Sequence, residues 1–256
     1  MAEYDRQTLN ARAGSAAAID EGLRSYMLRV YNYMGIGLVI TGLTAWFAAQ
    51  AAVTSNATAA AAQLQSGEYL TQWGVLLYTT PLMWVVALAP LAFVLVLSFG
   101  INKLSVPAAQ ATFWAFSAIM GLSLSSIFLV YTDASIAKVF FITAATFGAM
   151  SLYGYTTKRD LSGMGSFLMM GLIGIIIASI VNIFMQSSMM EFVISVVGVL
   201  IFTGLTAYDT QKIKESYSEH YGADVMAKNA IMGALSLYLD FINLFMMLLR
   251  LFGNRE

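Results

Sequence analysis

The chain has 256 residues, of which 59% are hydrophobic and only 11% are charged, whereas roughly 25% of residues in an ordinary soluble domain are charged. The net charge of −1 and the lack of a Lys/Arg-rich tract give no electrostatic basis for binding nucleic acid. With no cysteine and one histidine, His220, the chain has neither a disulfide framework nor a thiolate or imidazole zinc site, although oxygen ligands for hard cations are present. This composition indicates an integral membrane protein.

Residues 1–25 are polar and charged, without an apolar core ahead of a small-residue cleavage site, so we expect no secretory signal peptide. Seven apolar runs follow, each long enough for a helix to cross a ~30 Å hydrocarbon core. Pro81 and Pro90 fall inside the second run, where we expect a kinked helix. The sequence therefore predicts an all-α polytopic membrane protein, with a polar tail over 1–25 and one domain over 26–256. The runs lie near 27–52, 76–99, 109–131, 135–157, 166–187, 191–211 and 229–250.

The distribution of basic residues predicts the orientation. Positive charges concentrate in the tail and in alternate loops: Arg6, Arg12, Arg24, Arg29, Lys103, Lys158, Arg159, Lys212, Lys214 and Lys228. The intervening loops hold Lys138 alone, so the positive-inside rule places the amino terminus in the cytoplasm. Seven crossings would put Arg250 and Arg255 outside, against that rule. Either the last segment crosses despite them or it is re-entrant, and we favour seven crossings.

Two acidic residues lie within the apolar runs, Asp209 near the end of the sixth and Asp240 in the middle of the seventh. A carboxylate in the bilayer centre costs ~2.5–3.5 kcal/mol on insertion scales, so intramembrane acids are functional-site candidates. Helical spacing puts Ser236 and Asn243 on the same face as Asp240, and Thr206 on the face of Asp209. Asp209 has a second interpretation, as an interfacial partner of Lys212 three residues later.

The predicted depths of the two acids differ. If both helices start at the same membrane plane, Asp209 and Asp240 differ in height by roughly 10 Å, which is too far for sharing a proton. The sixth helix can, however, continue past Lys212 into the segment KIKESYSEH, with its lysines reaching toward water. This extension would lower Asp209 into the bundle.

Three segments carry a resemblance to a known family: GLTAYDTQKIK over 204–214, GALSLYLDFINLF over 233–245 and TTPLMWVVALAPLAFVLVLSFG over 79–100. With the seven apolar runs, they resemble the bacterial branch of the Bax inhibitor-1 family, the transmembrane Bax inhibitor motif proteins, over nearly the whole chain after about residue 20. The resemblance implies a bundle whose last helix is surrounded by the other six, in the bacterial inner membrane. The family's proposed gate can include a basic residue on the second helix, and residues 76–99 contain no Lys or Arg.

The resemblance also implies a function. It implies a pH-sensitive calcium leak, controlled by a hydrogen-bonded aspartate pair that matches Asp209 and Asp240, with Tyr208 in the same motif. Two carboxylates in a low-dielectric site cannot both ionise cheaply, so such a pair tends to hold one shared proton. Gain of a second proton removes the charged acceptor, and loss of the last leaves two repelling anions that attract a divalent cation. We thus expect calcium as a permeant ion with transient contact at the pair, and no cofactor or catalytic residue.

Other protein classes fit the sequence less well. An intramembrane aspartyl protease would need a glycine-any-glycine-aspartate motif, whereas Asp240 follows Tyr238 and Leu239. A retinal protein needs a lysine in its last helix, and residues 229–249 contain none. The stronger alternative is a non-conducting regulator that binds a membrane protease or another membrane protein, a role to which bacterial members of the family have been linked.

Overall fold

The structure is a computed structural model that describes residues 2–56, 61–63 and 69–254, with side chains from residue 21 onward. Seven of its described helices are long and apolar enough to cross a bilayer, and only the short α2 is not. This confirms the predicted class of all-α, polytopic membrane protein. The helices are α1 (Ala2–Ala52), α2 (Gln72–Thr79), α3 (Leu82–Gly100), α4 (Val106–Leu124) with its 3-10 extension η2 (Ser125–Leu129), α5 (Asp133–Thr156), α6 (Ser162–Met185), α7 (Ser188–Glu215) and α8 (Ala223–Phe252).

The second span begins later than the sequence predicted. Residues 76–79 belong to α2, which ends at Thr79, and Pro81 precedes α3 as its N-cap. Proline is tolerated at the start of a helix because the first amides have no partner within the helix. Pro81 therefore begins the span instead of kinking it, whereas Pro90 does lie inside α3.

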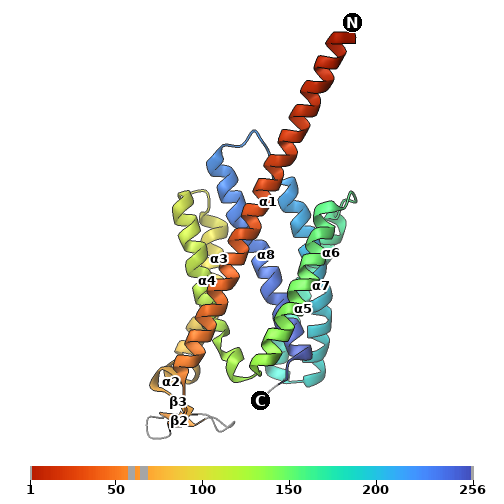
Figure 1. Ribbon diagram of the computed structural model, residues 1–256. Coiled ribbons are helices and arrows are strands. Elements are labelled where there is room, and N and C mark those ends of the chain that lie inside the picture. Colours follow the sequence, from red (N-terminus) through yellow and green to blue (C-terminus); the bar gives the residue numbers. More distant parts are fainter. Residues whose placement is uncertain (1, 57–60, 64–68, 255–256) are drawn as a thin grey trace.

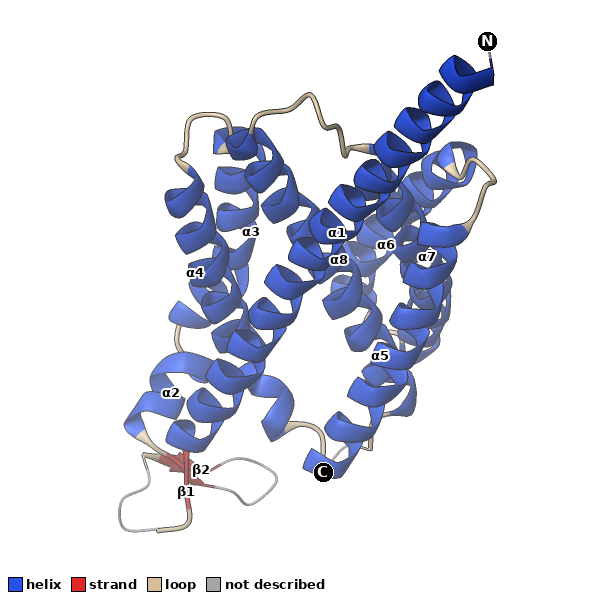
Figure 2. Cartoon of the chain, turned by 45° about the horizontal axis from the view of Figure 1, so that its top comes forward, coloured by secondary structure: helices blue, strands red, loops and turns tan. Residues whose placement is uncertain are grey.

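The two ends of the bundle differ in what connects the helices (Figure 1). At one end, a small antiparallel sheet of β1 (Val53–Thr54), β2 (Ala62–Gln63) and β3 (Tyr69–Leu70), in the order β1-β3-β2, leads from α1 to α2. The carboxyl terminus lies at this end, which we call the carboxyl side. At the amino side, the first turns of α1 project beyond the other helices (Figure 2). The side chains of Arg6, Arg12 and Arg255 lie outside the described residues.

Helix α8 is the central helix of the bundle. The most apolar window of α8 is 72% buried, against 11% for α3 and for α6, and α8 packs against α1, α4, α5 and α7. At the amino side, Lys228 donates to the carbonyl of Asn102 after α3 (3.5 Å). At the carboxyl side, the amide of Asn254 donates to the hydroxyl of Ser135 in α5 (2.9 Å). The last segment therefore crosses the whole bundle, obliquely (Figure 1), as favoured from the sequence.

A buried hydroxyl pair fixes one face of α8. Tyr238 is completely buried, and its hydroxyl lies 2.6 Å from the hydroxyl of Thr41 in α1. Thr41 also donates to the main-chain oxygen of Ser117 in α4 (2.8 Å), and the rings of Phe113 and Phe116 stand edge-on to Tyr238. Because residues two apart in a helix point in nearly opposite directions, this anchor leaves Asp240 on the other face of α8, toward α7.

Candidate functional site

Asp209 and Asp240 come together at the contact between α7 and α8. Their side chains form a hydrogen bond with each other. A hydrogen bond between two carboxyl groups needs one O–H donor, so this bond forms only when the pair holds a proton. Asp240 is only 5% exposed, and its Oδ2 atom is buried without a hydrogen-bond partner among the described residues. The bond to Asp209 is thus the main polar contact that the structure describes for Asp240.

The tertiary structure removes the difference in depth that the sequence predicted. Helix α7 continues past Lys212 to Glu215, and Lys214 donates to the carbonyl oxygen of Tyr155 at the end of α5 (2.8 Å). The oblique course of α8 (Figure 1) starts beside α3 and α4 and reaches α7 only further along. The extension and the tilt together allow the two carboxyl groups to meet.

The acid pair lies where two cavities meet. On the amino side, a cavity of about 270 Å³ is lined by Asp209, Lys212, Ser216, Asn229 and Ser236, among others. Toward the carboxyl side, a cavity of about 650 Å³ between α3, α6, α7 and α8 is lined by both carboxylates, Ser236 and Asn243. Asp209 and Ser236 line both cavities, whereas Asp240 lines the larger one, so the acid pair lies beside a boundary between these two spaces.

The two cavities differ in chemical character. The amino-side cavity carries an ammonium, a carboxylate, two hydroxyls and an amide on its walls. Most of the deeper cavity's lining is apolar, with Leu91 of α3 and Ile176 and Ile183 of α6 on its outer walls. These three side chains are more than half exposed on the surface of the bundle. In this conformation the deeper cavity is open toward the hydrocarbon of a bilayer, and an ion beyond the acid pair would meet an apolar space.

The predicted supporting residues divide into two groups. Ser236 and Asn243 lie with the carboxylates, although the Asn243 amide already donates to the Leu239 carbonyl of its own helix (2.8 Å). The Thr206 hydroxyl donates to the Phe202 carbonyl (2.8 Å), and the Tyr208 ring packs against Gly165 of α6. The hydrogen bond described for Thr206 therefore stays within α7, the Tyr208 ring contacts α6, and neither contact reaches the acids. Ser216 and Asn229 also line the amino-side cavity. The sequence did not single them out, because neither belongs to a motif.

Lys212 is close enough to influence Asp209 without replacing Asp240 as its partner. The Lys212 ammonium lies 5.9 Å from the centroid of the Tyr208 ring, and its charge acts on the Asp209 carboxylate. Asp209 nevertheless hydrogen-bonds with Asp240. The geometry thus gives Asp209 an acid as its hydrogen-bond partner, with the Lys212 charge in its vicinity.

Among the described residues, two carboxylates line the cavities at the site. Calcium takes 6–8 oxygen ligands, whereas the described residues contain no cluster of three or more His, Cys, Asp or Glu side chains. The side-chain oxygens of Ser236 and Asn243 lie near the two carboxylates in the lining of the larger cavity.

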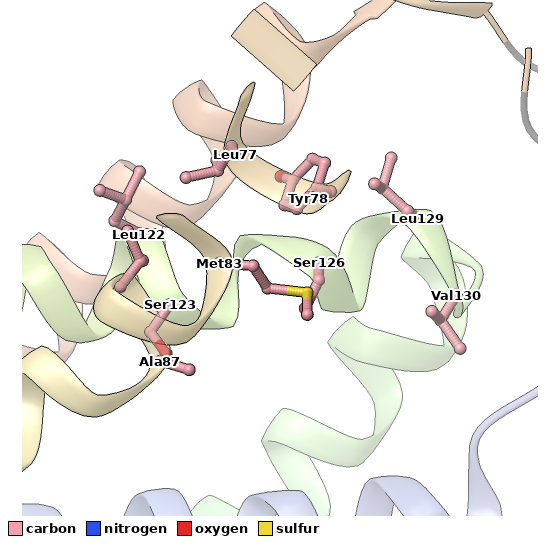
Figure 3. Close-up of a pocket in the computed structure, with 10 residues that line it drawn as sticks. Leu77, Tyr78, Met83, Ala87, Leu122, Ser123, Ser126, Leu129 and Val130 are labelled. Atoms are coloured by element: carbon pink, nitrogen blue, oxygen red, sulfur yellow. The ribbon is translucent and has the colours of Figure 1, made fainter. Parts of the chain in front are cut away.

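A further cavity lies at the carboxyl side, away from the acids. It has a volume of about 510 Å³ and is enclosed by α2, α3, α4 and η2 (Figure 3). The Tyr78 hydroxyl donates to the hydroxyl of Ser125 (2.9 Å), and burial raises the pKa of Tyr78, so this phenol stays protonated. Its lining is mainly aliphatic, with Ser123 and Ser126 at one wall, and contains no carboxylate.

The fold and this site together define a class of protein: a polytopic membrane protein with seven membrane-spanning helices and a carboxyl pair, one member of it buried, between its sixth and seventh spans. The model of the family "Inhibitor of apoptosis-promoting Bax1" matches residues 23–256. The chain therefore belongs to the Bax inhibitor-1 family, as its sequence motifs suggested.

Similar proteins come from several bacteria. The inner membrane protein YbhL of Escherichia coli K12 is 47% identical over 248 residues, which cover 96% of this chain and 98% of YbhL. An uncharacterized protein of Caulobacter vibrioides is 47% identical, covering 93% of this chain and 92% of its own length. The uncharacterized protein RP147 of Rickettsia prowazekii is 46% identical with the same coverage. The similarity thus extends over the entire seven-helix bundle.

Proposed function

We propose that this protein is a pH-sensitive cation leak, with calcium as a permeant ion, in which the Asp209–Asp240 pair is the gate. One observation carries the proposal: the two carboxyl groups are hydrogen-bonded to each other at the boundary between two cavities. A shared proton ties α7 to α8 across that boundary. The tie depends on protonation, so the opening of the boundary depends on pH.

The pair responds to protonation in two directions. With one proton, one oxygen donates and the other carboxylate accepts, which is the strong, charge-assisted form of the bond. A second proton removes the charged acceptor, and loss of the last proton leaves two anions that repel. Cation flux is therefore expected to be lowest where the pair holds one proton, and to rise on either side.

The conformation described here corresponds to a closed gate in this proposal. The acids are tied to each other, and the space beyond them is apolar. A cation needs water or oxygen ligands throughout its path, because an uncompensated charge in hydrocarbon is costly. Opening thus requires both that the acids separate and that the deeper cavity becomes hydrated.

We also propose the orientation and membrane. Among the described residues, the amino side carries most of the basic side chains and the carboxyl side carries Lys138 and Arg250, which places the amino side in the cytoplasm under the positive-inside rule. The similarity to an inner membrane protein of E. coli supports the bacterial inner membrane as the location. We expect neither catalytic activity nor a cofactor.

The test is calcium flux into liposomes that contain only this protein, measured across a series of pH values. Asp240→Asn replaces a carboxyl by an amide of the same shape, and it should abolish the pH dependence while the protein stays folded and inserted. Asp224→Asn is the matched control, because Asp224 is an exposed aspartate in the first turn of the same helix. If Asp240→Asn retains the wild-type pH response, the gate assignment is wrong.

The alternative is a non-conducting regulator that binds a membrane protease or another membrane protein. The observation that favours it is the apolar, bilayer-facing character of the deeper cavity, together with the projecting first turns of α1 (Figure 2), which form a surface outside the bundle. Liposomes with the wild-type protein distinguish the two functions. A regulator gives no flux above that of protein-free liposomes at any pH.

A further inference from the structure

A groove separates α1 from α5 in the amino-side half of the bundle. Its volume is about 520 Å³, which is within the ~300–1,000 Å³ of small-ligand sites. Leu28 of α1 and Leu152 of α5 form its outer edges and are 52% and 64% exposed. Met27 and Phe147 form the inner walls and are almost completely buried. The groove therefore opens sideways, toward the bilayer, and is distinct from both cavities at the acid pair.

The hydroxyl groups at the floor of the groove are hydrogen-bonded to one another. The Tyr31 hydroxyl lies 2.5 Å from the Ser151 hydroxyl, and Ser151 lies 2.9 Å from the hydroxyl of Thr210 in α7. Thr210 in turn donates to the Thr206 carbonyl (2.7 Å). Because these hydroxyls already pair with one another, what fills the inner groove is held by its apolar surface. The inner groove therefore suits hydrocarbon.

The mouth of the groove is positively charged. Arg24, exposed at the start of the first span, lines it. Tyr155 of α5 also lines the groove. Arg29 and Glu21 are exposed on α1 near Arg24 but are not among the lining residues. Arg24 therefore gives the mouth a positive charge that complements an anionic headgroup.

The charged mouth and the apolar walls are spaced like the headgroup and an acyl chain of a lipid. Arg24 and Tyr155 lie at the amino-side ends of their spans, where headgroups meet water. Gly148 lies about 10 Å deeper along α5 at ~1.5 Å per residue, among the apolar walls. Basic pockets between membrane helices bind anionic lipid headgroups in this arrangement. We propose that this groove is a binding site for one anionic phospholipid, with its phosphate at Arg24 and one acyl chain along Gly148.

Glycines that face open space allow the groove to be filled without disturbing the fold. A side chain added at Gly148 meets no atom within 4 Å, so Gly148→Phe places a ring in the groove. Gly174 of α6 also faces open space but lies outside this groove. Gly174→Phe is therefore the matched control. For the headgroup, Arg24→Gln is paired with Arg29→Gln on the same helix.

The experiment is native mass spectrometry of the full chain in detergent, titrated with phosphatidylglycerol or with phosphatidylcholine of the same acyl chains. We expect one phosphatidylglycerol to bind the wild type more tightly than phosphatidylcholine does. Gly148→Phe should abolish this binding and Gly174→Phe should keep it. Arg24→Gln should weaken it about five-fold, the contribution of one basic residue near an anionic headgroup, and Arg29→Gln should leave it unchanged. Thermal unfolding of each variant shows whether the fold is intact.

Four results would overturn the proposal. Equal loss of binding in the two glycine variants would mean that the groove is not the site. Equal binding of the two lipids would remove the role of the charged mouth. If inorganic phosphate binds at Arg24 while phosphatidylglycerol is insensitive to Gly148→Phe, the site takes a free anion and not a lipid. A dimer that Gly148→Phe dissociates would identify the occupant as a second copy of the chain.

Discussion

The coupling between Asp209 and Asp240 is the most direct consequence of the site geometry. Each acid supplies one half of the same hydrogen bond, so either Asp→Asn substitution removes the shared proton. The effects of Asp209→Asn and Asp240→Asn on flux should therefore be strongly non-additive. Residues that share a hydrogen bond typically show coupling free energies of ~0.5–3 kcal/mol. This corresponds to a deviation from additivity between about two-fold and about 150-fold in the ratio of fluxes, at ~1.4 kcal/mol per factor of ten.

The upper part of that range is expected here. Asp240 is 5% exposed, and its second oxygen has no partner among the described residues, so little water is available to replace the lost bond. The measurement is initial calcium flux in liposomes for the wild type, the two single variants and the double variant, over the same pH series. Equal amounts of folded protein, checked by size-exclusion chromatography, are needed in each preparation.

Lys212→Gln separates the two models of Asp209. If the shared proton is the gate, this variant should change the calcium flux very little, because exposed ion pairs contribute only ~0–1 kcal/mol. If Asp209 serves mainly as an interfacial partner of Lys212, the variant should instead mimic Asp209→Asn. Additive aspartate effects together with a strong effect of Lys212→Gln would refute the shared-proton gate and leave Asp240 to act alone.

Three further predictions concern topology and packing. Reporter fusions at the amino terminus and in the α3–α4 loop should report the cytoplasm. Fusions in the β-sheet segment and at the carboxyl terminus should report the outside. A carboxyl-terminal fusion that reports the cytoplasm would contradict seven crossings. Gly154→Ala should lower the melting temperature, at a cost of ~1–3 kcal/mol in stability, because the new Cβ would lie 2.2 Å from the carbonyl oxygen of Ala207. Gly174 faces open space, so Gly174→Ala should leave the melting temperature unchanged. Thr41→Val should lower the stability of the fold by ~1–3 kcal/mol, because it leaves the buried Tyr238 hydroxyl without its partner. Thr44→Val is the control, since the Thr44 hydroxyl bonds only to carbonyls of its own helix in the described structure. Equal losses of stability in the two threonine variants would contradict the anchor.

The sequence by itself determined the class of protein and its candidate site. Apolar runs of membrane-spanning length gave seven spans because length and hydropathy are local properties, and the structure has those seven. Asp209 and Asp240 stood out for the same reason, since each is a charge inside an apolar run. The YDTQ and LDFINLF motifs indicated the family that the comparisons show. The error at Pro81 is local too: hydropathy does not distinguish an apolar helix that ends before a proline from one that continues through it.

Only the tertiary structure decided which side chains meet. The relative height of two helices depends on their tilt and on where each one ends, so the sequence placed the acids roughly 10 Å apart although they are hydrogen-bonded. The oblique path of α8 also pairs Tyr238 with Thr41, far away in the chain, and orients Asp240 toward α7. The cavities at the acids and the groove between α1 and α5 follow from gaps in helix packing, and no periodicity within one helix encodes the shape of the space between two helices.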